Sequence, residues 1–315
     1  MMDTITFRFL ISLDVLERFE MRLMDVVTAY LYGSLDSDIY MKIPEGFRML
    51  EAYNSRPRNL YSIKLQRSLY GLKQSGRMWY NRLSEYLIKE GYINNLICPC
   101  VFIKKSESGF AIIAVYVDDM NLIGTPGELL KNAEYLKKEF EMKDLGKTKY
   151  CLGLEIEHKS DGILIHQSAY IEKILKRFNM DNAHPLSTPM IVRTLDPKKD
   201  PFRPLEYGEK ILGPEVPYLN AIGALLYLAK CTRPDITFSV NLLARFSLAP
   251  TLRHWSRIKY LFRYLRGTKD LGLYFSKSNN FSGLLCYADA GYLFDHHKAR
   301  SQTGYVFTYN GIAIS

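Results

Sequence analysis

Two adjacent carboxylates interrupt an apolar stretch of this sequence. Residues 111–124 are AIIAVYVDDMNLIG, in which Asp118 and Asp119 separate two runs of strand-forming residues. Carboxylate oxygens held on rigid strands bind hard divalent cations such as Mg²⁺. Two such ions close together activate a hydroxyl and stabilise a departing pyrophosphate. Since Asp-Asp also forms ordinary turns, the pair alone predicts either a metal site or a plain hairpin turn.

Further residues with chemical potential lie upstream. The segment 22–35, RLMDVVTAYLYGSL, places Asp25 at the end of a strand-like run and Tyr30 shortly after it. The segment 68–80, SLYGLKQSGRMWY, opens an amphipathic helix and contains Lys73. A tyrosine in such a run is usually a core residue, and a lysine at a helix start is usually solvated. Shared metal ions would require Asp25 to converge with the later pair, to within roughly 4 to 8 Å between carboxyl groups.

These residues need strands and helices to position them. Residues 100–124 predict a three-strand meander, with turns at 106–109 and at the Asp118–Asp119 pair. Residues 125–140 and 168–178 predict amphipathic helices. Up to about residue 180, strands and helices therefore alternate irregularly, which is typical of an α+β domain.

The composition changes after this region. Seven prolines between Asp181 and Pro217 predict a linker or an extended strap. Helices are expected again over 218–230, 234–247 and 250–267, and strands after Gly267. The basic, aromatic helix 250–267 suits phosphates and bases. It is equally well a common amphipathic helix whose cations extend into solvent.

The whole composition limits the class of protein. The 315 residues carry a net charge of +9 and 47% hydrophobic residues, as expected of a globular protein with polyanionic partners or a basic solvated surface. No apolar run has the length of a membrane span, and the start does not resemble a signal peptide. Five cysteines without C-x-x-C pairs argue against a disulfide scaffold or a zinc finger and fit a reducing compartment. His296 and His297 are metal-ligand candidates, although adjacent histidines in a polar run are usually exposed.

The motifs together resemble a known family. MDVVTAYLYGSLDSDIYMKIPEGF, LYGLKQSGRMWY, YVDDMNLIG, YCLGLEIE and YLAKCTRPDITFSVNLLARF follow the order and spacing of reverse transcriptases from Ty1/copia retrotransposons. The resemblance implies an α+β fold: a reverse-transcriptase palm with partial fingers and thumb-like helices, then a helical connection and a truncated RNase H-like sheet. The domains implied are reverse transcriptase at 1–180, a Pro-rich linker at 181–217, the connection at 218–270 and the RNase H-like segment at 271–315.

The resemblance also implies roles for particular residues. Asp25, Asp118 and Asp119 would be the catalytic, metal-binding carboxylates, with Mg²⁺ or Mn²⁺ as cofactor. Tyr30 matches the family's aromatic gate, which leaves no room for a ribose 2′-hydroxyl. Residues that contact the nucleotide and the template are matched by Gly71, Lys73 and Gln74. The first metal-binding aspartate of RNase H is matched by Asp289.

The implied reaction adds deoxynucleotides to a primer 3′-end on an RNA or DNA template. Expected partners are primer–template, deoxynucleoside triphosphates and other Pol segments, but no membrane. The expected location is the cytoplasm, a virus-like particle if the element is active, or the nucleus.

The sequence also departs from the family pattern. Little of the fingers region precedes the Asp25 strand, residues 289–295 (DAGYLFD) replace the usual Asp-Ala-Asp-Trp, and Gly76 stands where proline is common. We therefore expect weak or absent polymerase activity and no RNase H activity, since one matched aspartate does not complete a two-metal site. Two alternatives remain open: an inert remnant that binds nucleic acid, and a nuclease.

Overall fold

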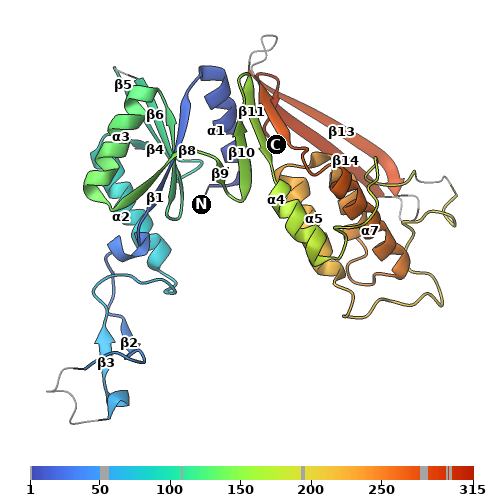
Figure 1. Ribbon diagram of the computed structural model, residues 1–315, viewed down its shortest axis with the longest axis horizontal. Coiled ribbons are helices and arrows are strands. Elements are labelled where there is room, and N and C mark those ends of the chain that lie inside the picture. The colour runs from blue at the N-terminus through green and yellow to red at the C-terminus, as the bar shows by residue number, and fades with distance from the viewer. Residues whose placement is uncertain are drawn as a thin grey trace. The chain divides into compact units, whose positions relative to one another are not determined.

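The computed structural model describes residues 2–49, 57–107, 109–192, 196–276, 283–295, 297 and 300–315. It mixes helices with antiparallel sheets, which confirms the α+β class (Figure 1). The chain divides into two compact units. One contains the residues up to Thr6 together with Arg18–Thr148, and the other contains Phe7–Glu17 together with Lys149–Ser315.

A six-stranded antiparallel sheet forms the first unit, in the order β4-β5-β6-β7-β1-β8. Its strands are β1 (Glu20–Val26), β4 (Ile93–Asn94), β5 (Val101–Ser106), β6 (Gly109–Tyr116), β7 (Asp119–Gly124) and β8 (Met142–Lys147). Strands β5, β6 and β7 are the predicted meander. Strand β8 was not predicted, because MKDLGK lacks the apolar character of a typical strand.

Two helices share one face of this sheet, α2 (Ser75–Lys89) and α3 (Pro126–Glu139). Pro126 occupies the start of α3, where a missing N–H costs nothing. Met24 and Val26 of β1 point into the core under these helices. Because successive strand residues point to opposite faces, Asp25 between them lies on the other face.

Smaller elements complete the first unit. They are η1 (Ala29–Tyr32), the 3₁₀ helix η3 (Arg58–Leu60), and a two-stranded sheet of β2 (Tyr40–Lys42) and β3 (Ser62–Lys64). An isolated bridge joins Ser34 to Arg67, and the Ser68 amide donates to the Gly33 carbonyl at 2.9 Å. These contacts bring the segment before α2 back to η1.

The second unit combines helices with a four-stranded antiparallel sheet in the order β12-β11-β10-β9. The strands are β9 (Tyr150–Cys151), β10 (Leu154–His158), β11 (Gly162–His166) and β12 (Leu273–Ser276). The helices are α4 (Ser168–Arg177), α5 (Tyr218–Cys231), η4 (Pro234–Ile236), α6 (Thr237–Ala244) and α7 (Leu252–Gly267). They share a core with Ile171, Leu225, Val240 and Phe262.

Helix α1 (Thr4–Glu17) also contributes to this unit from Phe7 onward. Phe7 and Ile11 are fully buried, and the Arg8 guanidinium donates to the carbonyls of Lys230, at 2.6 Å, and of Cys231. The start of the chain, predicted to be a short remnant of the fingers, forms a helix. Residues 7–17 of this helix belong to the same compact unit as the residues after 148, and the assignment to the fingers stays a prediction.

The described part of the Pro-rich segment 181–217 contains no helix or strand, as its prolines predict. It is nevertheless packed, since Phe202 is 2% exposed and Asp200 is fully buried. The boundary between the two compact units lies between Thr148 and Lys149, before β9. The sequence instead predicted that the first domain extends to residue 180. The predicted functional domains remain predictions.

A separate three-stranded antiparallel sheet ends the second unit, with β13 (Leu284–Asp295), β14 (Arg300–Tyr309) and β15 (Ile312–Ala313). Strand β12, expected to belong with these strands, pairs with β11 instead, for example Phe275 opposite Ile163. Among the described residues, no helix has both the length and the apolar character to cross a membrane.

Candidate active site

The three predicted aspartates lie next to one another at the end of β1 and in the β6–β7 turn. Strand β1 runs antiparallel beside β7 with Asp25 directly opposite Asp119, and the Val26 amide donates to the Asp118 carbonyl at 3.0 Å. Directly opposite residues share a face of the sheet, with Cβ atoms about 4.5–5.5 Å apart. The structure therefore brings together residues that are far apart in the sequence, while their catalytic roles remain predictions.

The turn of the β6–β7 hairpin differs by one residue from the expected one. Tyr116 pairs with Asp119, so the two-residue turn consists of Val117 and Asp118, and Asp119 begins β7. Val117 has a φ of 59°, a left-handed conformation that is costly for a β-branched residue. The Trp79 indole N–H donates to the Val117 carbonyl at 2.7 Å, and this hydrogen bond stabilises the turn.

Mutual repulsion characterises this group of acids. Partial burial raises the pKa of Asp119, and the negative charges of Asp118 and Asp25 raise it further. In the part of the chain that the structure describes, none of the three makes an ion pair within 4 Å. Lys143 of β8 lies opposite Asp25 on its other side, so a positive side chain flanks the group without pairing with it.

The aspartates fit a divalent cation by their chemistry. Oxygen ligands suit a hard cation, and a cation would relieve the repulsion that raises the pKa of Asp119. As the side chains are placed, however, no three His, Cys, Asp or Glu residues in the described ranges are grouped closely enough to enclose a metal ion.

Tyr30 lies close to this group, on the 3₁₀ helix η1 that follows β1. The Ser68 hydroxyl donates to the Tyr30 carbonyl, and the Tyr30 ring lies 4.6 Å from the Tyr70 ring, centroid to centroid. The Tyr30 hydroxyl is 3.9 Å from where a Cβ at Gly76 would stand, so a larger residue there would touch it.

Tyr70 was missed by the sequence analysis. Burial raises its pKa, and so do the charges of Asp118 and Asp25, which places the phenol near both carboxylates. Its side chain remains 54% exposed. The signal available in the sequence was its place directly before Gly71, in a segment already singled out.

Gly71, Lys73 and Gln74 lie on the loop that carries Tyr70. Gly71 has a φ of 97°, which glycine adopts without strain. Lys73 is exposed, and no ion pair is found for it among the described residues. Gln74 precedes α2 without capping it through its side chain. Among the described residues, no hydrogen bond or ion pair joins these three to the aspartates, so their predicted roles depend on a bound substrate.

A cavity of about 510 Å³ opens beside the hairpin turn. Its walls are mostly aromatic and apolar, and they include Tyr30, Trp79, Cys98, Pro99, Val115 and Val117. The candidate active site therefore combines a carboxylate group, an aromatic pair and an apolar hollow within one compact unit.

The predicted RNase H residue is isolated. Asp289 lies on β13 opposite Gly304 and is exposed. No set of three potential metal ligands surrounds it in the described ranges. It remains a prediction without a site around it.

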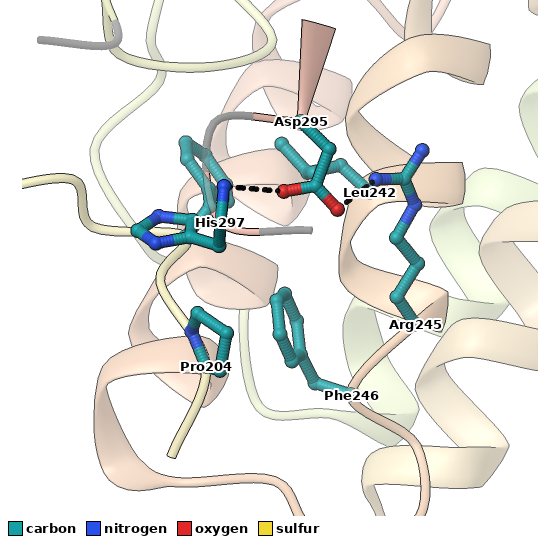
Figure 2. Close-up of a pocket in the computed structure, with 7 residues that line it drawn as sticks. Pro204, Leu242, Arg245, Phe246, Asp295 and His297 are labelled. Atoms are coloured by element: carbon teal, nitrogen blue, oxygen red, sulfur yellow. Dashed lines mark hydrogen bonds and ion pairs between the residues drawn. The ribbon is translucent and has the colours of Figure 1, made fainter. Parts of the chain in front are cut away.

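A second cavity, of about 160 Å³, lies elsewhere in the second unit (Figure 2). Asp295 accepts from Arg245 at 3.1 Å and from the His297 amide at 3.0 Å, and His297 Nε2 lies 3.1 Å from Asp200. The expectation that His297 is simply exposed is therefore wrong, because it is half-buried and paired. His296 lies outside the described residues. These groups satisfy one another, which indicates a structural network.

Comparison with known proteins supports the interpretation of the first cluster. Residues 2–192 match the family model described as reverse transcriptase (RNA-dependent DNA polymerase). The chain is 40% identical over 312 residues to the retrovirus-related Pol polyprotein from transposon TNT 1-94 of Nicotiana tabacum. That alignment covers 98% of this chain and 23% of the relative.

Other relatives agree. The Pol polyprotein from transposon RE1 of Arabidopsis thaliana is 35% identical over 95% of this chain and 19% of its own length. The putative transposon Ty5-1 protein of Saccharomyces cerevisiae is 31% identical over 93% of this chain and 91% of its own. The chain thus spans only about a fifth of the two plant polyproteins. It belongs to the Ty1/copia reverse transcriptases, the RNA-dependent DNA polymerases of retrotransposon Pol polyproteins.

Proposed function

We propose that this chain extends a primer 3′-end with deoxynucleotides on an RNA or DNA template by two-metal catalysis. The observation that carries the proposal is the register of β1 against β7, which sets Asp25 opposite Asp119 beside the Asp118 turn. In this proposal β1, β6 and β7 are the palm, β2 and β3 belong to partial fingers, and α4 is thumb-like.

Asp25, Asp118 and Asp119 would hold the divalent metal ions through their carboxylate oxygens. Bound Mg²⁺ or Mn²⁺ ions supply charge neutralisation for the 3′-hydroxyl and for the departing pyrophosphate. Asp25 and Asp119 present their oxygens from paired strands, so their separation depends on backbone hydrogen bonds rather than on a mobile loop. Asp118 adds a third carboxylate from the turn, which Trp79 holds in place.

Tyr30 and its loop select and orient the nucleotide. The Tyr30 ring stands against the sugar and excludes a 2′-hydroxyl, and the Tyr70 ring supports it from the side. Gly71 permits the backbone turn, while Lys73 and Gln74 contact the incoming nucleotide and the template. Lys73 is free to approach a triphosphate, since it is exposed.

The second unit contains the proposed connection, over 218–270, and the RNase H-like segment with Asp289. Template, primer and nucleotides are the proposed partners, together with other Pol segments. The cytoplasm, a virus-like particle or the nucleus is the proposed location. Weak polymerase activity and absent RNase H activity remain predictions.

A primer-extension assay tests the proposal. The protein is incubated with a primer on a homopolymer RNA template, deoxynucleotides, and either Mg²⁺ or Mn²⁺. We expect extension that disappears in EDTA and falls by at least a hundredfold in Asp118→Asn and in Asp119→Asn. Asp181→Asn, at an exposed position outside the site, serves as the matched control and should retain full extension.

The alternatives predict different outcomes in the same experiment. An inert remnant would bind the primer–template and extend nothing with either ion. A nuclease would shorten the primer, and Asp118→Asn would stop the shortening. Extension that survives both aspartate substitutions would refute the proposed roles of these residues.

A further inference from the structure

Two cysteines face one another in the wall of the larger cavity. Cys98 and Cys100 flank Pro99 in the turn between β4 and β5, and their Sγ atoms are 3.2 Å apart. Both cysteines line the cavity of about 510 Å³, but Cys98 is half-buried whereas Cys100 is 6% exposed. The Cys98 residue is therefore the more accessible of the two.

Hydrogen bonds on every side hold this turn. The Asn95 side-chain oxygen accepts from the amides of Ile97 and Cys98, both at 2.9 Å. The Pro99 carbonyl accepts from the Tyr80 hydroxyl at 2.9 Å and from the Asn94 amide group at 2.7 Å. The two thiols are thus presented to each other by a fixed backbone.

The turn is also connected to the candidate active site. The Val115 amide donates to the Cys100 carbonyl at 2.8 Å, and Val115 is on the strand that leads to the Val117–Asp118 turn. Cys98 shares its cavity with Tyr30 and Val117. A covalent change at Cys98 would therefore alter a wall of the cavity that Tyr30 and the turn residue Val117 also line.

We propose that Cys98 and Cys100 are an oxidisable dithiol, in which a peroxide converts Cys98 to a sulfenic acid and Cys100 resolves it to a disulfide. In the first step the Cys98 thiolate attacks one peroxide oxygen and the other leaves as hydroxide. In the second step the Cys100 sulfur attacks Cys98 Sγ, and the sulfenic oxygen leaves as water. Overall, two thiols and one hydrogen peroxide give one disulfide and two waters.

Geometry and exposure assign the order of the two cysteines. Closing the bond requires the Sγ atoms to move from 3.2 Å to about 2.05 Å, a small displacement for two side chains. Burial and the neighbouring Cys98 raise the pKa of Cys100 to about 12, so Cys100 is a poor first nucleophile. The accessible Cys98 reacts first, and the adjacent buried thiol then completes the bond.

Peptide mass spectrometry of the 315-residue chain tests this proposal. The folded chain, with the exposed Cys286 changed by Cys286→Ser, is treated with hydrogen peroxide, alkylated and digested with trypsin. The tryptic peptide 90–104 contains both cysteines and no other. We expect this peptide to lose two hydrogen atoms and both alkylation sites, and dithiothreitol should restore them. Titratable thiols should fall by two.

Two variants test the order of the steps. In Cys100→Ser, dimedone should trap a sulfenic acid at Cys98, whereas in Cys98→Ser no adduct should form at Cys100. Unmodified thiols in peptide 90–104 after peroxide treatment would overturn the proposal, and so would separate sulfinic acids at each cysteine. The measurement on the unsubstituted pair decides the matter even if a variant fails to fold. It is independent of whether the chain extends a primer.

Discussion

The folded structure disfavours the ionised form of the Asp119 carboxyl group. Its pKa is raised by burial and by Asp118 and Asp25, so folding favours its protonated form. The stability it contributes is present below its unfolded pKa, near 3.9, and is lost as pH rises through its raised folded pKa. At neutral pH without metal, the ionised site therefore destabilises the first unit.

We expect Asp119→Asn to raise the melting temperature at pH 7 in EDTA. The gain should be under about 1 kcal/mol, because water partly screens a half-exposed carboxylate. It should shrink towards pH 4, and Mg²⁺ should stabilise the original chain more than the variant. Differential scanning calorimetry with Asp181→Asn as control measures this. A variant that is less stable at pH 7 would contradict the argument.

Tyr70 supports a second prediction at the residue scale, which depends on the proposed polymerase function. Tyr70→Ala removes the ring beside Tyr30, and we expect discrimination between deoxy- and ribonucleotides to fall about tenfold in kcat/KM. Tyr70→Phe keeps the ring and should retain discrimination. Single-nucleotide incorporation measures both. Equal losses in the two variants would show that the hydroxyl, rather than the ring, is responsible.

Between elements, Asp144 ties β8 to β1 and α3. Arg22 donates two hydrogen bonds to it, at 2.8 and 2.7 Å, and Lys137 lies 2.8 Å away. The Arg22 guanidinium holds the pKa of Asp144 well below its usual range, and Lys137 adds to this. Such a group stabilises the fold above its unfolded pKa, and the contribution is lost as pH falls through its depressed folded pKa.

Asp144→Asn should therefore cost about 1–2 kcal/mol at pH 7, because it weakens charged hydrogen bonds between three elements. The difference from the original chain should begin to narrow below about pH 4, near the unfolded pKa of an aspartate, and should disappear only as pH falls through the depressed folded pKa of Asp144. Urea unfolding at several pH values measures it. Asp36→Asn weakens the exposed pair with Arg77 and an exposed hydrogen bond from Ser37, and should have little effect. A pH-independent difference would contradict the electrostatic cause.

In the second unit, Arg233 joins the end of α5 to η4 and the end of α7. Its side chain is 1% exposed, and it donates to both oxygens of Asp235 and to Thr268. Burial opposes ionisation of Asp235, but Arg233 still holds its pKa below the usual range. The pair is therefore charged, with the Arg233 side chain buried and the Asp235 side chain about one-third exposed at 35%.

Arg233→Met should destabilise the protein by about 1.5–3 kcal/mol, because it removes the charged hydrogen bonds from the buried guanidinium to Asp235 and Thr268. The double variant Arg233→Met, Asp235→Leu should lose less than the sum of the two single variants, since the Arg233–Asp235 interaction can be lost only once. Chemical unfolding of the single and double variants measures the coupling. If the double variant loses the sum of both single effects, the two residues do not act as a pair.

At the scale of the whole molecule, the net charge of +9 is the relevant quantity. Helix α7 is less free to bind phosphates than its sequence suggests. Arg253 pairs with Glu209, Arg263 donates to the His184 carbonyl and Arg266 to the Ala183 carbonyl. These contacts favour a structural role over phosphate binding at these three arginines.

Affinity for a primer–template duplex should fall steeply with salt, by roughly tenfold or more between 50 and 200 mM for several phosphate contacts. Asp118→Asn should leave the slope unchanged, because that carboxylate serves the proposed metal chemistry and not the phosphate backbone. Fluorescence anisotropy at several salt concentrations measures both. If the affinity does not depend on salt concentration, both the polymerase hypothesis and the hypothesis of an inert nucleic-acid-binding remnant lose support.

Local sequence patterns predicted many of the secondary-structure elements. Alternating apolar residues predicted the meander, helical spacing predicted α3 and α4, and prolines predicted the irregular segment before α5. The motif order identified the family, which the relatives confirm. These features depend on residues close together in the chain, so the sequence alone determined them.

The tertiary structure decided which distant segments meet. It paired β12 with β11, assigned Phe7–Glu17 to the second unit, and set Tyr70 against Tyr30. Each depends on strand register and on the closure of long loops, and no local propensity determines either. For the same reason the carboxylates were found in the sequence, while the ring beside them and the thiol pair in the cavity wall were not.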